Sequence, residues 1–97
     1  MSYNALTQFI DSVNAMNAIF GGEDYDSLNL SYSDLSELRQ RVEARLSPEN
    51  LTCDGELPRA EVEQRYRFYQ AVLKDIDNCE NELMLNDFNY VGSRHHY

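Results

Sequence analysis

The residues best suited to chemistry are the carboxylates of a short acidic run, Glu23, Asp24 and Asp26. Oxygen ligands at alternate positions form a calcium loop, which also needs a glycine at its sixth position and a glutamate at its twelfth. Counted from Asp24, those two positions hold Asn29 and Leu35. The run therefore lacks the calcium pattern, and we expect neither a metal nor a cofactor there.

Two cysteines and two adjacent histidines are the other groups that could bind a metal or attack a substrate. Cys53 and Cys79 lie far apart, whereas a structural zinc site uses four ligands in closely spaced pairs. His95 and His96 are adjacent near the end of the chain, and nothing upstream supplies an orienting group or an oxyanion site for a cysteine nucleophile. We therefore expect no metal site and no catalytic residues, and we predict that the protein is not an enzyme.

Charge is distributed unevenly along the chain, whose net charge is −9. No lysine or arginine precedes Arg39, and none lies between Lys74 and Arg94. Acidic stretches of this kind repel nucleic acid and anionic lipid and attract basic surfaces. The composition argues against direct nucleic-acid binding, which needs clustered Lys and Arg, and against a membrane protein, because no apolar run could span a bilayer.

The acidic residues and the tyrosines near them predict a surface that binds a partner protein. Carboxylates on helices and loops can approximate the roughly 3.4 Å spacing of phosphates along a DNA strand. Tyrosine is enriched at interfaces because it combines rigid area with a hydroxyl group. The expected partner is the basic surface of a nucleic-acid-binding protein or complex. The residues predicted to contact it are Glu23, Asp24, Tyr25, Asp26, Tyr32, Asp34, Glu37, Asp75 and Glu82.

Hydrophobic periodicity predicts one all-α domain over residues 1–97, with three helices near 4–20, 34–46 and 58–85. The first helix should bury one face and end at the glycine pair after Phe20. Ser33 and Asp34 are the expected caps of the second helix, with a capping box that Glu37 closes on Asp34. Ser47-Pro48 should end that helix and can start a further single turn. The apolar face of the first helix holds Leu6, Phe9, Ile10, Val13, Met16 and Phe20.

The third helix carries an apolar seam with the spacing of a coiled coil. The seam residues are Val62, Tyr66, Tyr69, Leu73 and Ile76, and the predicted core is Phe9, Val13, Leu38, Val42, Tyr66, Tyr69, Leu73 and Ile76. Glu80 falls at the centre of this stripe, where an unpaired carboxylate would be costly to bury. We favour a helix that leaves the core near Asn78; alternatively, Glu80 meets a cation across an interface.

Two segments have no helical period. Residues 28–32 alternate apolar and polar side chains, which is a strand signal. Residues 88–91 could pair with them as a minor two-stranded sheet, or residues 86–97 could form a mobile tail.

Together these features favour a non-enzymatic inhibitor or regulator that occupies the basic surface of a nucleic-acid-handling protein as a DNA mimic. Small acidic helical proteins are frequent among phage-encoded inhibitors of host defence, and this chain shares that general character without sharing a motif. A cytoplasmic location is expected, because the N-terminus has no signal pattern and the cysteines should stay reduced. The alternative is a structural or assembly subunit that oligomerises or docks through the seam of the third helix.

Overall fold

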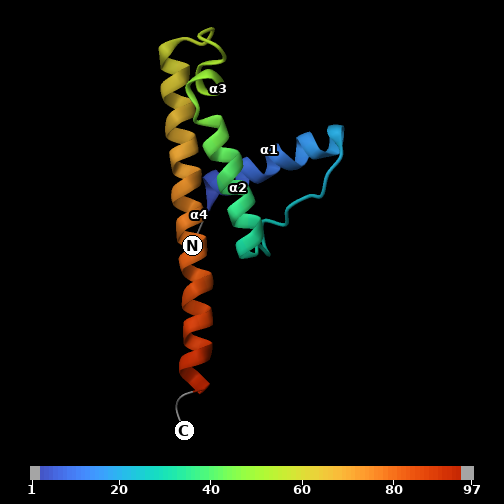
Figure 1. Ribbon diagram of the computed structural model, residues 1–97, viewed down its shortest axis with the longest axis vertical. Helices are drawn as coiled ribbons and strands as arrows, with labels where there is room; N and C mark the ends of the chain where they lie inside the picture. The colour runs from blue at the N-terminus through green and yellow to red at the C-terminus, as the bar shows by residue number, and fades with distance from the viewer. Residues whose placement is uncertain (1–2, 95–97) are drawn as a thin grey trace.

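The fold is all-α over the part of the chain that the computed structural model describes, which is the backbone of residues 3–94 and the side chains of residues 3–85 (Figure 1). Its helices are α1 (Asn4–Phe20), α2 (Tyr32–Arg45), α3 (Pro48–Thr52) and α4 (Arg59–Arg94). α4 forms the long axis of a molecule that measures 62 × 28 × 20 Å. α2 runs beside the first part of α4, while α1 lies across both and projects to one side (Figure 1). The predicted fold class is confirmed.

The core forms where α1 crosses α2 and α4. The rings of Phe9 and Tyr69 meet edge to face there, with their centroids 6.3 Å apart. Burying a large apolar side chain of this kind stabilises the fold by about 1.5–3 kcal/mol. The core residues, each at most 5% exposed, are Leu6, Phe9, Ile10 and Val13 of α1, Leu35, Leu38 and Val42 of α2, and Tyr69, Val72 and Ile76 of α4.

Only the first half of the apolar face of α1 is buried. Met16 and Phe20 are 46% and 79% exposed, although the sequence predicts them on the same face as Phe9 and Val13. The reason is the crossing geometry, because α2 and α4 cover the beginning of α1 and its last turns extend beyond them (Figure 1).

The seam of α4 differs from the predicted seam. Tyr66 is exposed and Leu73 is half-buried, so the prediction of Tyr66 in the core is wrong. The buried positions are instead Tyr69, Val72 and Ile76, and Cys79 and Leu83 pack against the same cluster. Arg65 takes a place in this seam with its guanidinium 5.9 Å from the centroid of the Tyr69 ring. A long arginine stem can cover apolar surface while its charge stays at the edge. Because Arg65 is charged, the apolar pattern of the sequence did not indicate that it belongs to the seam.

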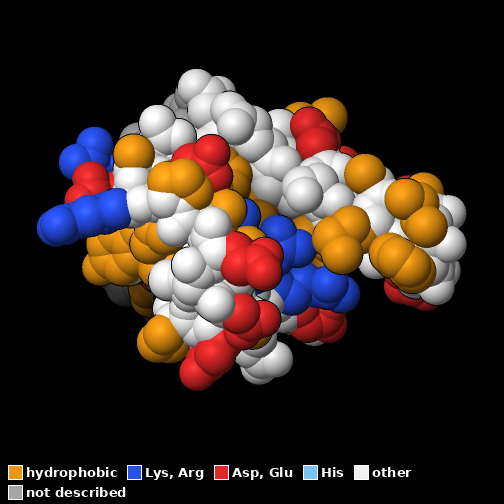
Figure 2. Space-filling view, turned by 90° about the horizontal axis from the view of Figure 1, so that it is seen from above, with side chains coloured by type: hydrophobic (Ala, Val, Ile, Leu, Met, Phe, Trp, Pro, Cys, Tyr) orange, Lys and Arg blue, Asp and Glu red, His pale blue; other side chains and the backbone are white. Residues whose placement is uncertain are grey.

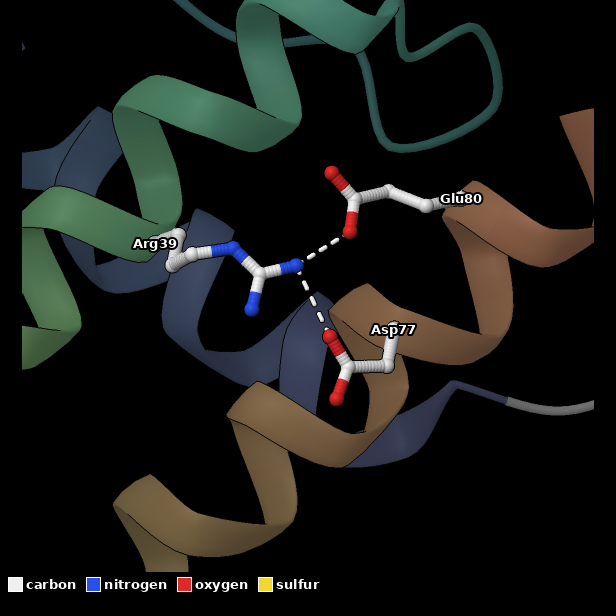
Figure 3. Close-up of polar contacts among 3 residues, drawn as sticks. All are labelled: Arg39, Asp77 and Glu80. Atoms are coloured by element: carbon white, nitrogen blue, oxygen red, sulfur yellow. Dashed lines mark hydrogen bonds and ion pairs between the residues drawn. The ribbon is translucent and has the colours of Figure 1, made fainter. Parts of the chain in front are cut away.

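Glu80 meets a cation from the same chain. A guanidinium nitrogen of Arg39 on α2 donates to the Glu80 carboxylate, and it also donates to Asp77 Oδ1 at 2.8 Å (Figure 3). The favoured expectation that the helix leaves the core near Asn78 is therefore wrong, since Leu83 still packs against the core. The hydrogen bond to Asp77 raises the pKa of Arg39, the Glu80 charge adds to this, and burial opposes both.

The predicted strand pairing does not form. Residues 28–31 make a turn and an irregular segment, and residues 88–91 continue α4, which ends at Arg94 instead of near residue 85. Residues 95–97 of the predicted tail lie outside the described residues. No helix in the described part of the chain is long and apolar enough to cross a membrane.

α2 begins earlier than predicted because Ser31 is its N-cap. The Ser31 hydroxyl accepts from the backbone N–H of Asp34, and the Asp34 carboxylate accepts from the backbone N–H of Ser31, each at 3.1 Å. This is a capping box, but on Ser31 and Asp34, so the expected box between Asp34 and Glu37 is wrong. Glu37 is therefore available for another contact.

Candidate functional site

The loop between α1 and α2 turns back along α1 and is held there by two asparagine side chains. The amide of Asn14 donates to the carbonyl oxygen of Tyr25 and accepts from its N–H, both at 2.9 Å. Asn17 donates to the carbonyl oxygen of Glu23 at 2.9 Å. Backbone groups that would otherwise bond to water are thus fixed to a helix, and the acidic residues of the loop hold a defined position relative to α1.

Gly22 allows this close return. Its φ of 132° is one that side chains rarely adopt, and a Cβ there would lie 3.1 Å from Oδ1 of Asn17. Any other residue would therefore strain the backbone and press on the asparagine that holds Glu23.

A polar hollow of about 290 Å³ lies between this loop and α2. The loop lines one wall and α2 lines the other, so residues far apart in the sequence face one space. Five of the predicted partner-binding residues meet here: Glu23, Asp24, Tyr25, Asp34 and Glu37. We call this the acidic hollow, and its remaining lining residues are Asn17, Gly21, Gly22 and Arg41.

Tyr25 and Glu37 form the central contact of the acidic hollow. The Tyr25 hydroxyl donates to Oε1 of Glu37 at 2.6 Å. Burial raises the pKa of Tyr25, and the bond to Glu37 adds to that shift, while nearby Arg41 opposes it. Tyr25 is therefore a neutral hydrogen-bond donor under ordinary conditions. Sequence reasoning missed Arg41, although its spacing of four residues from Glu37 places the two on one face of a helix.

The other predicted residues have different surroundings. Asp26 accepts from the N–H of Leu28 at 2.9 Å within its own turn, and Tyr32 is the first residue of α2. Asp75 accepts from the N–H of Leu6 at 3.1 Å, which satisfies a free amide in the first turn of α1. Asp26 and Asp75 therefore already have partners within the fold, and neither lines the acidic hollow.

Glu82 lies beside a second hollow, of about 410 Å³, between α1, the loop and α4. Burial raises the pKa of Tyr3 in this hollow to about 12, and the Glu82 carboxylate adds to the effect. Burial also raises the pKa of the Cys79 thiol, so the reactive thiolate is disfavoured. Among the described residues, no group of three or more His, Cys, Asp or Glu side chains is placed to hold a metal ion.

Exposed apolar side chains gather at the projecting end of α1, beside the acidic loop. Figure 2 shows them at the right edge of the view. Met16, Ile19 and Phe20 make up this group, which we call the apolar tip, and Ile19 and Phe20 are 76% and 79% exposed. Sequence reasoning missed the apolar tip because it placed Met16 and Phe20 on the same helix face as Phe9 and Val13 and did not predict where that face stops being covered.

No family model, curated protein or solved structure matches this chain. The function of the site must therefore be inferred from its own residues.

Proposed function

We propose that the protein is a non-enzymatic inhibitor or regulator that occupies the basic surface of a nucleic-acid-handling protein, in the manner of a DNA mimic. The observation that carries this proposal is the acidic hollow, where carboxylates of the loop and of α2 surround one space. Because Asn14 and Asn17 fix the backbone of the loop, that backbone needs little ordering when a partner binds.

Glu23 and Asp24 are the residues best placed to contact basic side chains. Both are exposed, and neither side chain forms a hydrogen bond or an ion pair with another described residue. Hydrogen bonds between carboxylates and Lys or Arg are shorter and stronger than those between neutral groups. Free carboxylates therefore favour a partner whose surface carries Lys and Arg, as a nucleic-acid-binding groove does.

Several other acidic side chains already accept hydrogen bonds within the fold, which reduces the number of residues that we assign to the proposed contact. Asp75 and Asp26 accept from backbone amides, and Asp34 closes the capping box of α2. We assign the direct contacts to Glu23, Asp24 and the Tyr25–Glu37 pair, and long-range attraction to the remaining acids. Attraction of this kind is screened over roughly 8–10 Å, so the association rate should fall steeply with salt.

The test is a capture experiment with matched charge reversals. The tagged protein is mixed with lysate of its native cells at low salt, and bound proteins are eluted with a salt gradient and identified. The test variant is Glu23→Lys with Asp24→Lys. The control is Glu56→Lys with Glu61→Lys, which changes the net charge equally at two exposed residues outside the acidic hollow.

We expect a nucleic-acid-binding protein that the wild type and the control retain and that the test variant loses. Duplex DNA or RNA should compete with the wild type for the captured protein. Equal loss with both variants, or a captured protein whose nucleic acid does not compete, would contradict the proposal.

A cytoplasmic location is part of the proposal. Cys53 and Cys79 are both free thiols, and Cys53 is exposed. Reducing compartments keep exposed thiols free, whereas secreted proteins usually pair them.

The length of α4 favours a second candidate, a structural or assembly subunit. The last turns of α4 extend well beyond the other helices (Figure 1), and Met84 and Leu85 are 57% and 58% exposed. A subunit of this kind should oligomerise through α4 without another protein and at any moderate salt. Sedimentation over a range of concentrations tests this candidate, since Met84→Ser with Leu85→Ser should then yield a monomer.

A further inference from the structure

The apolar tip of α1 makes no contribution to the core, although its residues are as apolar as those of the core. Ile10 and Phe9 at the other end of α1 are at most 1% exposed, whereas Ile19 and Phe20 are more than three-quarters exposed. Single exposed apolar side chains are ordinary, but a contiguous exposed group often marks an interaction site. Three such residues on two successive turns, at the end of a helix that projects from the molecule, form a group of this kind (Figure 2).

The apolar tip is held in place from two sides. Nη2 of Arg45 on α2 donates to the Met16 sulfur at 3.5 Å. The loop that follows Phe20 is tied to α1 by the hydrogen bonds of Asn14 and Asn17. A partner that binds the apolar tip would therefore have little backbone to immobilise, and immobilisation is part of the cost that limits affinity.

The charges beside the apolar tip indicate which kind of partner it fits, because Glu23 and Asp24 outnumber Arg45, the cation that contacts Met16. Glu23 and Asp24 follow Phe20 after only the two glycines. A second copy that docked tip to tip would bring these acids close to their own counterparts, and like charges at an interface are destabilising. A partner whose apolar cleft is rimmed by Lys and Arg would instead pair with them.

We propose that the apolar tip is a hydrophobic anchor that inserts into an apolar cleft rimmed by Lys and Arg on the partner protein. The basic rim rests on the proposed function, while the anchor rests on the exposure of Met16, Ile19 and Phe20. The two parts have different tasks. The carboxylates accelerate and orient the encounter, and the buried apolar side chains slow dissociation, as central aromatic residues do at many interfaces.

Two synthetic peptides of equal composition separate these tasks. The first is an 18-residue helix of leucine and lysine whose leucines form one stripe flanked by lysines. The second has the same residues in an order that scatters the leucines around the helix. Each is titrated into the full-length ¹⁵N-labelled protein, and backbone amide shifts report where it binds. The test variant is Ile19→Ser with Phe20→Ser, and the control is Met84→Ser with Leu85→Ser, which replaces two exposed apolar side chains of α4.

We expect the striped peptide to shift amides of residues 16–24 and to bind about 10- to 100-fold more tightly than the scattered peptide, the effect of burying one or two large apolar side chains. The test variant should lose this advantage, and the control should keep it. Unchanged thermal unfolding of both variants would show that the loss is not a folding defect.

The contrary outcomes distinguish the two proposals. Equal affinity of both peptides at Glu23 and Asp24 overturns the anchor and leaves the acidic surface standing. Shifts away from residues 16–24 with both peptides contradict the acidic surface as well. A wild-type dimer that the test variant abolishes overturns the anchor in favour of self-association.

Discussion

The two halves of α1 carry similar apolar side chains but have opposite environments. Phe9 and Ile10 are enclosed by α2 and α4, while Ile19 and Phe20 are exposed at the projecting end of the same helix. The difference arises from where the neighbouring helices cross, since hydrophobicity is shared by both halves. An apolar face therefore stabilises the fold over one stretch and is left available for binding over the next.

The largest expected difference between the halves is in stability, and a matched pair of substitutions measures it. Ile10→Ala removes a fully buried side chain and should lower the free energy of unfolding by about 2–5 kcal/mol. Ile19→Ala, on the same helix, should change it by less than about 0.5 kcal/mol. Urea denaturation gives both values, and equal destabilisation would mean that the end of α1 is packed.

The attachment of the acidic loop to α1 should weaken at Tyr25 with Asn14→Ala, while the bond from Asn17 to Glu23 remains. This change removes both hydrogen bonds to the backbone of Tyr25, which together are worth about 1–3 kcal/mol. Hydrogen exchange at the Tyr25 amide should accelerate, while exchange in the first half of α1 stays slow. Gln8→Ala, an exposed change on the same helix, is the control. Unaltered exchange at Tyr25 would show that the loop is held by other contacts.

The packed end of α1 depends on a carboxylate from α4. Asp75→Ala should cost about 1 kcal/mol, because the amide of Leu6 loses its acceptor in the first turn of the helix. Asp11→Ala changes an exposed acid of α1 and should be nearly neutral. Thermal unfolding compares the two variants, and equal midpoints would exclude a stabilising role for Asp75.

The smallest effect is absent at neutral pH and appears only in alkali. Burial and Glu82 raise the pKa of Tyr3 to about 12 from its usual 10.0, so the folded state holds a proton that the unfolded state releases first. The stability from the neutral hydroxyl is complete below about pH 10 and is lost as the pH rises towards 12. The wild type should therefore lose more stability than Tyr3→Phe between pH 9 and 11. An equal loss of stability in the wild type and in Tyr3→Phe would mean that the Tyr3 hydroxyl is solvated in the folded protein.

Local signals in the sequence predicted much of the fold. The bounds of α1 were predicted correctly, because Gly21-Gly22 ends the helix unambiguously. The register of α4 was predicted incorrectly, because Arg65 occupies a position in the seam. Its guanidinium lies over the Tyr69 ring and donates to the carbonyl oxygen of Asn50, and the sequence indicates neither contact. The capping box of α2 was misplaced by three residues, because Ser31 and Ser33 are equally good caps until the loop geometry is known.

The candidate site could be predicted only in part. Composition indicated the acids of the loop, and their meeting with Glu37 depends on a loop return that Asn14 and Asn17 produce. These asparagines look like ordinary polar residues of a helix in the sequence. The structural role of Asp75 was equally hidden, because its partner is the amide of Leu6 on another helix.

Site-specific photo-crosslinking tests most directly whether the projecting end of α1 is a binding surface. A benzophenone amino acid replaces Phe20 in the full chain in one sample and Tyr66, which is 49% exposed on α4, in another. Both are expressed in the native cells and irradiated, and crosslinked proteins are identified. We predict a crosslink from position 20 to a nucleic-acid-binding protein and none to it from position 66. A crosslink to that protein from position 66 alone, or only to a second copy from position 20, would contradict the account.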